Sequence, residues 1–229
     1  MSAGTLLLWR HGRTAYNAAA RLQGQIDIPL DDVGRWQART AAAQIVERYE
    51  PTHIVVSDLG RAVETASFLA RAAGIEAVVD PRVRERAFGE WEGLTHDELA
   101  GRWPEAFEAW RTGSDPAGVG AETRAQVAER AREAIEEHAA SLDRSDTLVV
   151  VSHGAAIGVA AAALLGQEPH WRGLQGMHNA HWAELRPSSG DPSWRMSGYN
   201  LGPSHSVRSW NEGPSVPAEQ ADEETRDPS

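Results

Sequence analysis

The chain has 229 residues. It contains no Lys, so all 22 residues counted as Lys or Arg are Arg, and it contains no Cys. The absence of Cys excludes thiolate nucleophiles, thiolate metal sites and disulfides, and it favours a reducing compartment. The absence of Lys excludes Schiff-base chemistry and the phosphate-binding Lys of Walker-type motifs. The net charge of −11 argues against general binding to nucleic acid or to an anionic membrane, because both need a basic protein surface.

The sequence carries no recognisable targeting or membrane segment. The first apolar run, residues 6–9, is too short for the core of a signal peptide, and no stretch reaches the roughly 18 apolar residues of a membrane helix. We therefore expect a cytoplasmic protein without membrane partners. Residues 1–212 are expected to form one domain. Residues 213–229 hold five acids, three Pro and no aromatic residue, which is typical of a disordered acidic tail.

Strand-like and helix-like patterns alternate along the chain. Short apolar runs predict strands over residues 5–9, 54–56, 76–79, 147–152, 182–185 and 194–196. Capping residues, Gly and Pro signals and longer Ala-rich patterns predict helices over residues 32–49, 60–73, 122–142 and 155–165, with a helical middle segment broken at Pro104. This alternation favours a layered α/β fold with a largely parallel sheet.

Reactive side chains follow four of the predicted strands. They are Arg10 and His11, Ser57 and Arg61, Glu85, and His153. Because ligands bind at the carboxyl ends of the strands in open α/β sheets, these side chains are expected to meet in one cleft. Two guanidiniums suit a phosphate group, an imidazole is a nucleophile, and a carboxylic acid can protonate a departing oxygen. The set predicts phosphoryl transfer without a metal.

Five motifs in chain order contain these residues. They are Arg10-His11-Gly12 with Thr14 and Asn17, the run 21–24 with Asp27 and Leu30, the run 57–62 with Thr65 and Ala66, Glu85 with the run 88–93, and Ser152-His153-Gly154. Over roughly residues 5–186 they make the chain resemble the histidine phosphatase superfamily, in its phosphoglycerate mutase-like branch. One Arg-His-Gly tripeptide is a weak signal, whereas five ordered motifs at family-like spacing are a specific one.

The resemblance implies a fold and a set of roles. The fold is a three-layer α/β/α sandwich with a mostly parallel central sheet. His11 is implied as the phosphorylated nucleophile and Glu85 as the proton donor. The residues implied to hold the phosphate are Arg10, Asn17, Gln23, Gly24, Arg61, a protonated His153, and Gly154. No metal or other cofactor is implied, because fixed cations supply the positive charge.

Within the superfamily, the chain is more similar to small-molecule phosphatases than to mutases. Residues 21–25, 93–96 and 176–182 resemble the actinobacterial phosphatases of glucosyl-3-phosphoglycerate, which implies a small phosphorylated metabolite as substrate. A phosphoglycerate mutase that depends on 2,3-bisphosphoglycerate is the alternative, although the chain lacks the Lys and the long middle insertion of that branch. A phosphoester-binding module without catalysis is a third reading, which would need a damaged site. The sequence leaves homo-oligomer formation open.

One departure from the resemblance bears on the substrate. Relatives usually carry Gly-Gly-Glu-Ser before the long helix, and this chain has Gly-Ala-Glu-Thr at 120–123. The change keeps the acid and a hydroxyl, so it affects substrate fit more than chemistry. Two roles also have structural alternatives, since Glu85 stands among three Arg in a run typical of a solvated surface, and His153 could simply cap a helix.

Several further residues are weaker candidates. His178 and His181 suggest a metal pair, but no other ligands stand at a known spacing, so no metal is predicted. Trp91 or Trp110 could face a sugar, although core packing explains most Trp residues. The Gly-containing loop 113–120 is expected to make a poor lid, which favours water over a second sugar acid as the phosphoryl acceptor.

Overall fold

The computed structural model of the protein describes residues 2–214, so most of the predicted acidic tail lies outside the described residues. The strands are β1 (Thr5–Arg10), β2 (His53–Val56), β3 (Ala77–Val79), β4 (Thr147–Ser152), β5 (Trp182–Pro187) and β6 (Trp194–Leu201). The α-helices are α1 (Ala15–Ala18), α2 (Asp32–Tyr49), α3 (Gly60–Ala73), α4 (His96–Arg102), α5 (Pro104–Arg111), α6 (Arg124–Ala140), α7 (Gly154–Leu164) and α8 (Val207–Glu212).

One six-stranded sheet forms the middle layer, in the order β3-β2-β4-β1-β5-β6. The first four strands of that order are parallel, and β5 and β6 extend one edge with antiparallel pairs. The predicted mostly parallel sheet is therefore confirmed. The register of β1 and β4 places Arg10 opposite Ser152, so the residues that follow these two strands start side by side.

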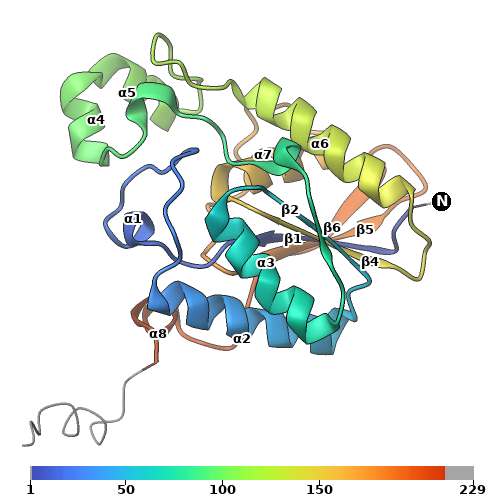
Figure 1. Cartoon of the computed structure of the whole chain (residues 1–229). Helices are drawn as coiled ribbons and strands as arrows, with labels where there is room; N and C mark the ends of the chain where they lie inside the picture. The colour runs from blue at the N-terminus through green and yellow to red at the C-terminus, as the bar shows by residue number, and fades with distance from the viewer. Residues whose placement is uncertain (1, 215–229) are drawn as a thin grey trace, which may run out of the picture.

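Helices cover both faces of this sheet (Figure 1). Successive side chains of a strand point to opposite faces, and β1 is buried on both. Leu6 and Leu8 belong to the hydrophobic core that α6 and α7 complete, whereas Leu7 and Trp9 belong to the core that α2 and α3 complete. This two-sided burial explains why the strand is apolar throughout. The three-layer sandwich implied by the family resemblance is confirmed.

Local signals fix most helix ends. Asp31 caps α2 by accepting from Gly34 N, and α3 ends at Gly74, as the sequence predicts. The long helix α6 starts at Arg124 rather than at residue 122, because Thr123 is its N-cap and accepts from Gln126 N. The helices α1 and α8 have only four and six residues, and the sequence analysis did not predict them.

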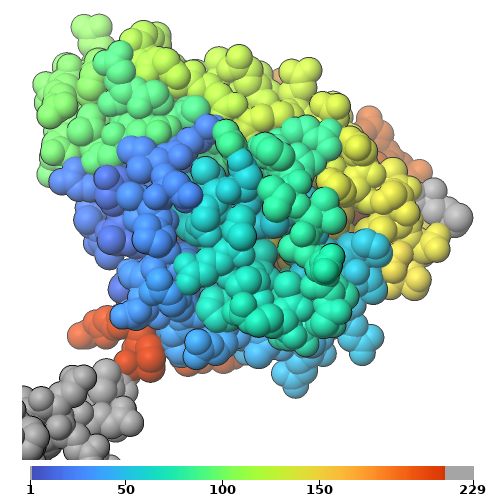
Figure 2. Space-filling model, in the orientation of Figure 1, coloured from blue at the N-terminus to red at the C-terminus, as the bar shows by residue number. Residues whose placement is uncertain are grey.

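The middle segment forms a small helical lobe at the end of the molecule where the parallel strands finish. Its helices α4 and α5 enclose a third hydrophobic cluster, which contains Trp91 and Phe107. Figure 2 shows this lobe, in green, against the N-terminal loop, in blue. The contact includes hydrogen bonds from Leu22 N to Leu94 O (2.9 Å) and from Gly93 N to Leu22 O (2.7 Å). The lobe thereby borders the sheet edge that carries the reactive side chains.

Within residues 2–214, none of the helices combines the length and the apolar character needed to cross a bilayer.

Candidate active site

The predicted reactive residues meet at the carboxyl ends of the parallel strands. His11 follows β1, and its backbone N–H donates to the carbonyl of Ser152 at the end of β4 (3.0 Å). His153 follows β4, and the ring centroids of His11 and His153 lie 5.1 Å apart. The two imidazoles are therefore neighbours although they are 142 positions apart in the sequence (153 − 11).

The ring of His11 is held in one tautomer. Its Nδ1 lies 2.7 Å from the carbonyl oxygen of Gly12, and a carbonyl can only accept a hydrogen bond. Nδ1 therefore carries the proton, and the lone pair is on Nε2. Burial lowers the pKa of His11 well below its usual value, and the nearby Arg61 and Arg10 lower it further. His11 is a neutral imidazole with an unprotonated Nε2 at neutral pH.

The backbone around His11 is closely packed. Gly12 N donates to Thr65 Oγ1 (3.1 Å), and a Cβ on Gly12 would lie only 2.3 Å from the carbonyl oxygen of Gly34. Asn179 Nδ2 donates to the carbonyl of His11 (3.2 Å) from the loop before β5. Only glycine fits after the histidine, which explains the third residue of the Arg-His-Gly motif.

His153 has fixed hydrogen-bond roles as well. Arg61 Nε can only donate, so His153 Nδ1 accepts (3.2 Å), and His153 Nε2 donates to Ser57 Oγ (2.8 Å). The ring is fully buried, and burial lowers the pKa of His153 well below its usual value, with Arg61 adding to the effect. The expectation of a protonated His153 is wrong for this geometry, because a protonated ring could not accept from Arg61.

Arg61 is fully buried at the start of α3, and its guanidinium makes three bonds to the protein. Besides the bond to His153, Nη1 donates to Ile26 O and Nη2 to Gly24 O, both at 2.7 Å. A guanidinium has five N–H groups, so one N–H on each terminal nitrogen remains. These bonds fix the plane of Arg61 and give Gly24 a role through its carbonyl.

Arg10 lies against the first residue of α7. Its Nη1 donates to the carbonyl of Met177, and its buried Nε has no hydrogen-bond partner among residues 2–214. A Cβ on Gly154 would stand 3.3 Å from Arg10 Cζ, which is tighter than usual contacts, so glycine lets the guanidinium lie flat there. Burial lowers the pKa of Arg10, and Glu85 partly opposes this effect.

Glu85 is fixed at the N-terminus of α7. Its Oε1 accepts from Arg86 N (2.9 Å) and Ala156 N (2.8 Å), and its Oε2 accepts from Ala155 N (3.1 Å). The carboxyl group is thus a fixed element of the site and does not belong to a solvated charge run. Oε2 makes the single bond and is the oxygen with the freer lone pair.

Asn17 and Gln23 belong to one network around Thr14. Asn17 Oδ1 accepts from Thr14 N and Thr14 Oγ1 (both 3.2 Å) and from Asn179 Nδ2 (3.1 Å). Gln23 Oε1 accepts from Thr14 Oγ1 (3.0 Å). Since both amide oxygens point into this network, the amide N–H groups of Asn17 and Gln23 are the atoms left for a ligand.

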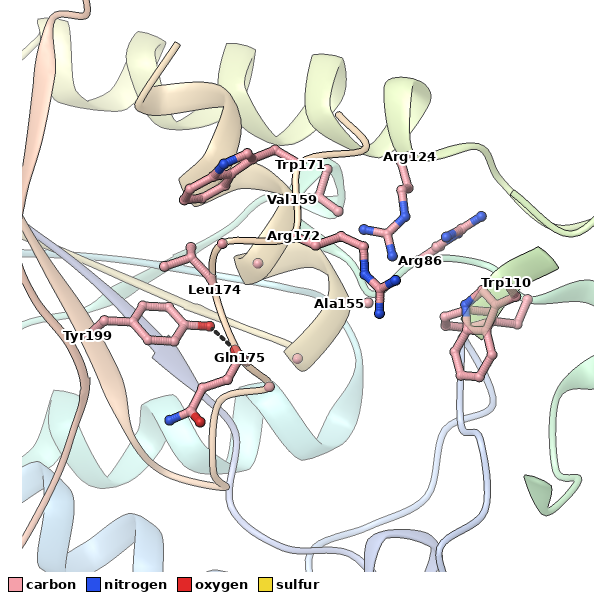
Figure 3. Close-up of a pocket in the computed structure, with 15 residues that line it drawn as sticks. Arg86, Trp110, Arg124, Ala155, Val159, Trp171, Arg172, Leu174, Gln175 and Tyr199 are labelled. Carbon is pink, nitrogen blue, oxygen red and sulfur yellow. Dashed lines mark hydrogen bonds between the residues drawn. The ribbon is translucent and has the colours of Figure 1, made fainter. Parts of the chain in front are cut away.

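A cavity of about 610 Å³ opens beside Gly154 (Figure 3). Sequence reasoning missed its cationic lining, which consists of Arg86, Arg124 and Arg172. The first two flank known motifs, but nothing in the sequence indicates that Arg172 joins them. Trp110 also lines the cavity.

Three weaker expectations can be compared with this geometry. Trp91 is fully buried and cannot face a sugar, so that expectation is wrong for Trp91. The loop 113–120 is held more firmly than its glycines suggested, because Asp115 pairs with Arg86 (2.7 Å) and Val119 is buried. The rings of His178 and His181 lie 5.3 Å apart, and among residues 2–214 no three His, Cys, Asp or Glu side chains are grouped to hold a metal ion.

The chain is similar to several known proteins. Residues 6–200 match the model of the histidine phosphatase superfamily (branch 1). The chain is 40% identical over 214 residues to the glucosyl-3-phosphoglycerate phosphatase of Mycobacterium tuberculosis strain H37Rv, a match that covers 87% of this chain and 96% of the relative. It is 39% identical over 173 residues to a probable phosphoglycerate mutase of Yersinia enterocolitica, covering 72% of this chain and 76% of the relative.

A solved structure is similar over most of the fold. The mycobacterial glucosyl-3-phosphoglycerate phosphatase, solved as a complex with VO3, superimposes with a TM-score of 0.79 at 39% sequence identity, covering 86% of this chain and 99% of the other.

Proposed function

Because the chain belongs to the histidine phosphatase superfamily (branch 1), we propose that it hydrolyses phosphomonoesters through a phosphohistidine at His11. The protein is a phosphatase by its family and relatives. The observation that carries the proposed mechanism is the bond between His11 Nδ1 and the Gly12 carbonyl, which leaves the Nε2 lone pair free. A neutral imidazole can attack phosphorus without first losing a proton.

In the first half-reaction, His11 Nε2 forms a bond to phosphorus while the bond from phosphorus to the alcohol oxygen breaks. That oxygen takes a proton from Glu85, for which the freer Oε2 is suited. Arg10 and Arg61 stabilise the phosphoryl oxygens, and both carry N–H groups that are not used by the residues described. His153 enters the cycle neutral, so the fixed positive charge comes from the two Arg.

In the second half-reaction, water attacks the phosphohistidine. Glu85, now ionised, takes a proton from that water, and the bond between phosphorus and Nε2 breaks as inorganic phosphate forms. Asn17, Gln23, Gly24 and Gly154 complete the phosphate pocket, the first two through their amide N–H groups. The positive charge of the Arg residues makes a metal or another cofactor unnecessary in this scheme.

The proposed substrate is a small phosphorylated metabolite, with glucosyl-3-phosphoglycerate as the preferred one. The support is that relatives named for this activity match nearly their whole length, whereas those named as probable mutases match about three quarters of theirs. A cytoplasmic location and the absence of nucleic-acid partners belong to the same proposal and are supported by composition and charge.

The deciding experiment offers the enzyme glucosyl-3-phosphoglycerate, 3-phosphoglycerate and 2-phosphoglycerate, with and without 2,3-bisphosphoglycerate. Phosphate release and isomer interconversion are followed together by phosphorus NMR. We expect phosphate release with a preference for the glucosyl ester and negligible interconversion of 3- and 2-phosphoglycerate. Interconversion that outpaces phosphate release would overturn the phosphatase in favour of the mutase.

A second experiment tests the charge supply. If Arg10 and Arg61 provide the positive charge, EDTA should leave the rate unchanged, while vanadate should inhibit because it resembles the transferring phosphoryl group. Loss of activity in EDTA that a divalent cation restores would contradict this part of the proposal and bring the pair of His178 and His181 back into consideration.

A further inference from the structure

The cavity beside the phosphoryl site has a cationic side. Its lining of fifteen residues contains three Arg and no acidic residue. Figure 3 shows the guanidinium groups of Arg124 and Arg172 pointing toward each other, with Arg86 and Trp110 beside them and Tyr199 on the opposite side. The three Arg come from three separate parts of the chain. A protein with a net charge of −11 has concentrated cations here, which is a costly arrangement unless an anion binds.

Arg86 is buried, and so is one atom of Arg124. Arg86 is 2% exposed, and it donates to Asp115 Oδ1 and to the carbonyl of Glu122, both at 2.7 Å. Arg124 Nε is buried and has no hydrogen-bond partner among residues 2–214. Burial lowers the pKa of Arg124, Asp115 partly opposes this effect, and the nearby Arg172 adds to it. The Arg124 guanidinium is thus partly desolvated, and its Nε is left without a partner among the residues described, in a side chain that lines the cavity.

The nearby acids do not balance this charge. Asp115 is the carboxylate next to the cluster, and it already accepts from the Arg86 side chain and from the backbone N–H of Arg124 (3.0 Å). The Glu122 carboxylate pairs with Arg130 (2.8 Å). Arg86 is balanced by Asp115 and, at longer range, by Glu85 and Glu122, so the positive charge available to a ligand is that of Arg124 and Arg172.

The cavity and the phosphoryl site share a wall. Gly154 and Ala155 line the cavity. The same Gly154 lies under the guanidinium of Arg10, and Ala155 N donates to Glu85. A substrate whose phosphoryl group reaches His11 therefore extends its leaving group past Glu85 toward the three Arg.

We propose that Arg124 and Arg172, backed by Arg86, form a subsite for a carboxylate carried by the leaving group of the substrate. The assignment rests on the proposed function, since it takes the phosphoryl position at His11 as given. Forked guanidiniums bind a carboxylate through paired N–H bonds, and a leaving group of the glycerate type presents a carboxylate within a few bonds of the phosphoester oxygen. The subsite selects acidic phosphoesters over neutral ones.

The test compares two substrates that differ by this group, 3-phosphoglycerate and glycerol 3-phosphate. The quantity measured is the ratio of their kcat/KM values, which cancels any loss of active enzyme. We expect the wild-type ratio to exceed about tenfold, and Arg124→Gln and Arg172→Gln each to lower it by about tenfold or more, mainly through KM for 3-phosphoglycerate. Arg86 is left intact because its bonds to Asp115 and Glu122 hold the wall of the cavity.

The control is Arg132→Gln on the same helix as Arg124, since Arg132 is half-exposed and makes only a 4.0 Å pair with Glu136. Its ratio should equal the wild-type ratio. A wild-type ratio near one, or unchanged ratios in both Arg variants, would overturn the subsite.

Failure of the proposed function is seen separately. Adding glucosyl-3-phosphoglycerate as a third substrate tests the preferred metabolite without changing the ratio above. If the wild-type enzyme shows no preference for the glucosyl ester, while Arg172→Gln lowers the ratio for the acidic substrate, the subsite is supported and the proposed metabolite is contradicted. An enzyme that releases phosphate from none of the three contradicts both.

Discussion

The phosphoryl site and the arginine cavity lie side by side but are built differently. The phosphoryl site takes its groups from the ends of β1 and β4 and from the start of α3, and hydrogen bonds to the protein hold His11, His153 and Arg61 in place. The cavity takes Arg172 from an exposed loop and Arg124 from a helix start, where Nε has no partner among the residues described. The groups proposed for the chemistry lie on strand ends and a helix start, whereas one of the two Arg proposed for substrate selection lies on an exposed loop, a kind of segment that tolerates change.

The largest effect expected on the phosphoryl side comes from His11→Ala. Removing a covalent nucleophile should lower kcat by several orders of magnitude and abolish labelling of the protein by the phosphoryl group of the substrate. Wild-type enzyme quenched during turnover should carry an acid-labile, alkali-stable phosphoryl group. A His11→Ala variant with more than about a tenth of wild-type activity would sink the nucleophile assignment.

Glu85→Gln should separate the acid from the phosphate pocket. A Gln amide oxygen can still accept from Ala156 N, so the end of α7 should keep its cap while the proton is lost. We expect kcat to fall by about 100-fold or more for an alkyl phosphoester, in the range usual for a general acid, but far less for p-nitrophenyl phosphate, whose leaving group departs without a proton.

The matched control for Glu85 is Glu90→Gln, which changes an exposed neighbouring carboxylate. It should leave both substrates unaffected. Equal losses for the alkyl and nitrophenyl esters in Glu85→Gln would mean that Glu85 supports structure and does not donate the proton.

The contrast between the two regions also explains what sequence reasoning could reach. The placement of Arg10, His11, Arg61 and His153 was predictable because each stands directly after an apolar strand or near the start of a helix, so local signals place them at one sheet edge. The ends of α2 and α3 were predictable for the same reason, through Asp31 and Gly74. Glu85 lies in a loop several residues past β3, where the local signal is weaker. The neutral state of His153 was not predictable from local signals, because it depends on a hydrogen bond from Arg61, which is 92 positions away in the sequence.

The arginine cavity and the helix α8 could not be predicted from the sequence. Arg86 pairs with Asp115 in a loop whose glycines suggested looseness, and Trp210 on α8 donates to the carbonyl of Asn179, although β5 and β6 lie between these two residues in the sequence. No short-range pattern encodes such contacts, since each needs the sheet to be assembled first. Trp91 shows the opposite error, because a residue considered as a platform for a ligand is part of the hydrophobic core.

The buried, neutral histidines of the phosphoryl site predict acid sensitivity. The folded-state pKa of His153 is lowered, so below the unfolded value of about 6.5 the unfolded chain binds a proton that the folded chain does not. Stability should therefore fall as pH drops from about 7 to 5. In His153→Gln the melting temperature should depend less on pH over that range than in wild type.

The control for this pH experiment is His53→Gln at an exposed histidine, which should keep the wild-type pH dependence. If His153→Gln and wild type lose the same number of degrees between pH 7 and 5, the folded protein binds a proton at His153 and the neutral assignment is wrong.

The smallest effect expected concerns the helix that the sequence did not predict. Trp210 on α8 is buried, and its Nε1 donates to the carbonyl of Asn179 (2.9 Å), whose own amide holds the carbonyl of His11 (3.2 Å). Trp210→Phe keeps an aromatic ring but removes one hydrogen bond, worth about 1 kcal/mol or roughly a fivefold change. If this bond positions the His11 loop, kcat should fall by up to that factor with KM nearly unchanged. Trp194→Phe, an equally buried Trp in the core on the other face of the sheet, should leave kcat as it is. Equal kcat values in the two variants, measured well below both melting temperatures, would mean that Trp210 does not position the His11 loop and that α8 has only a structural role.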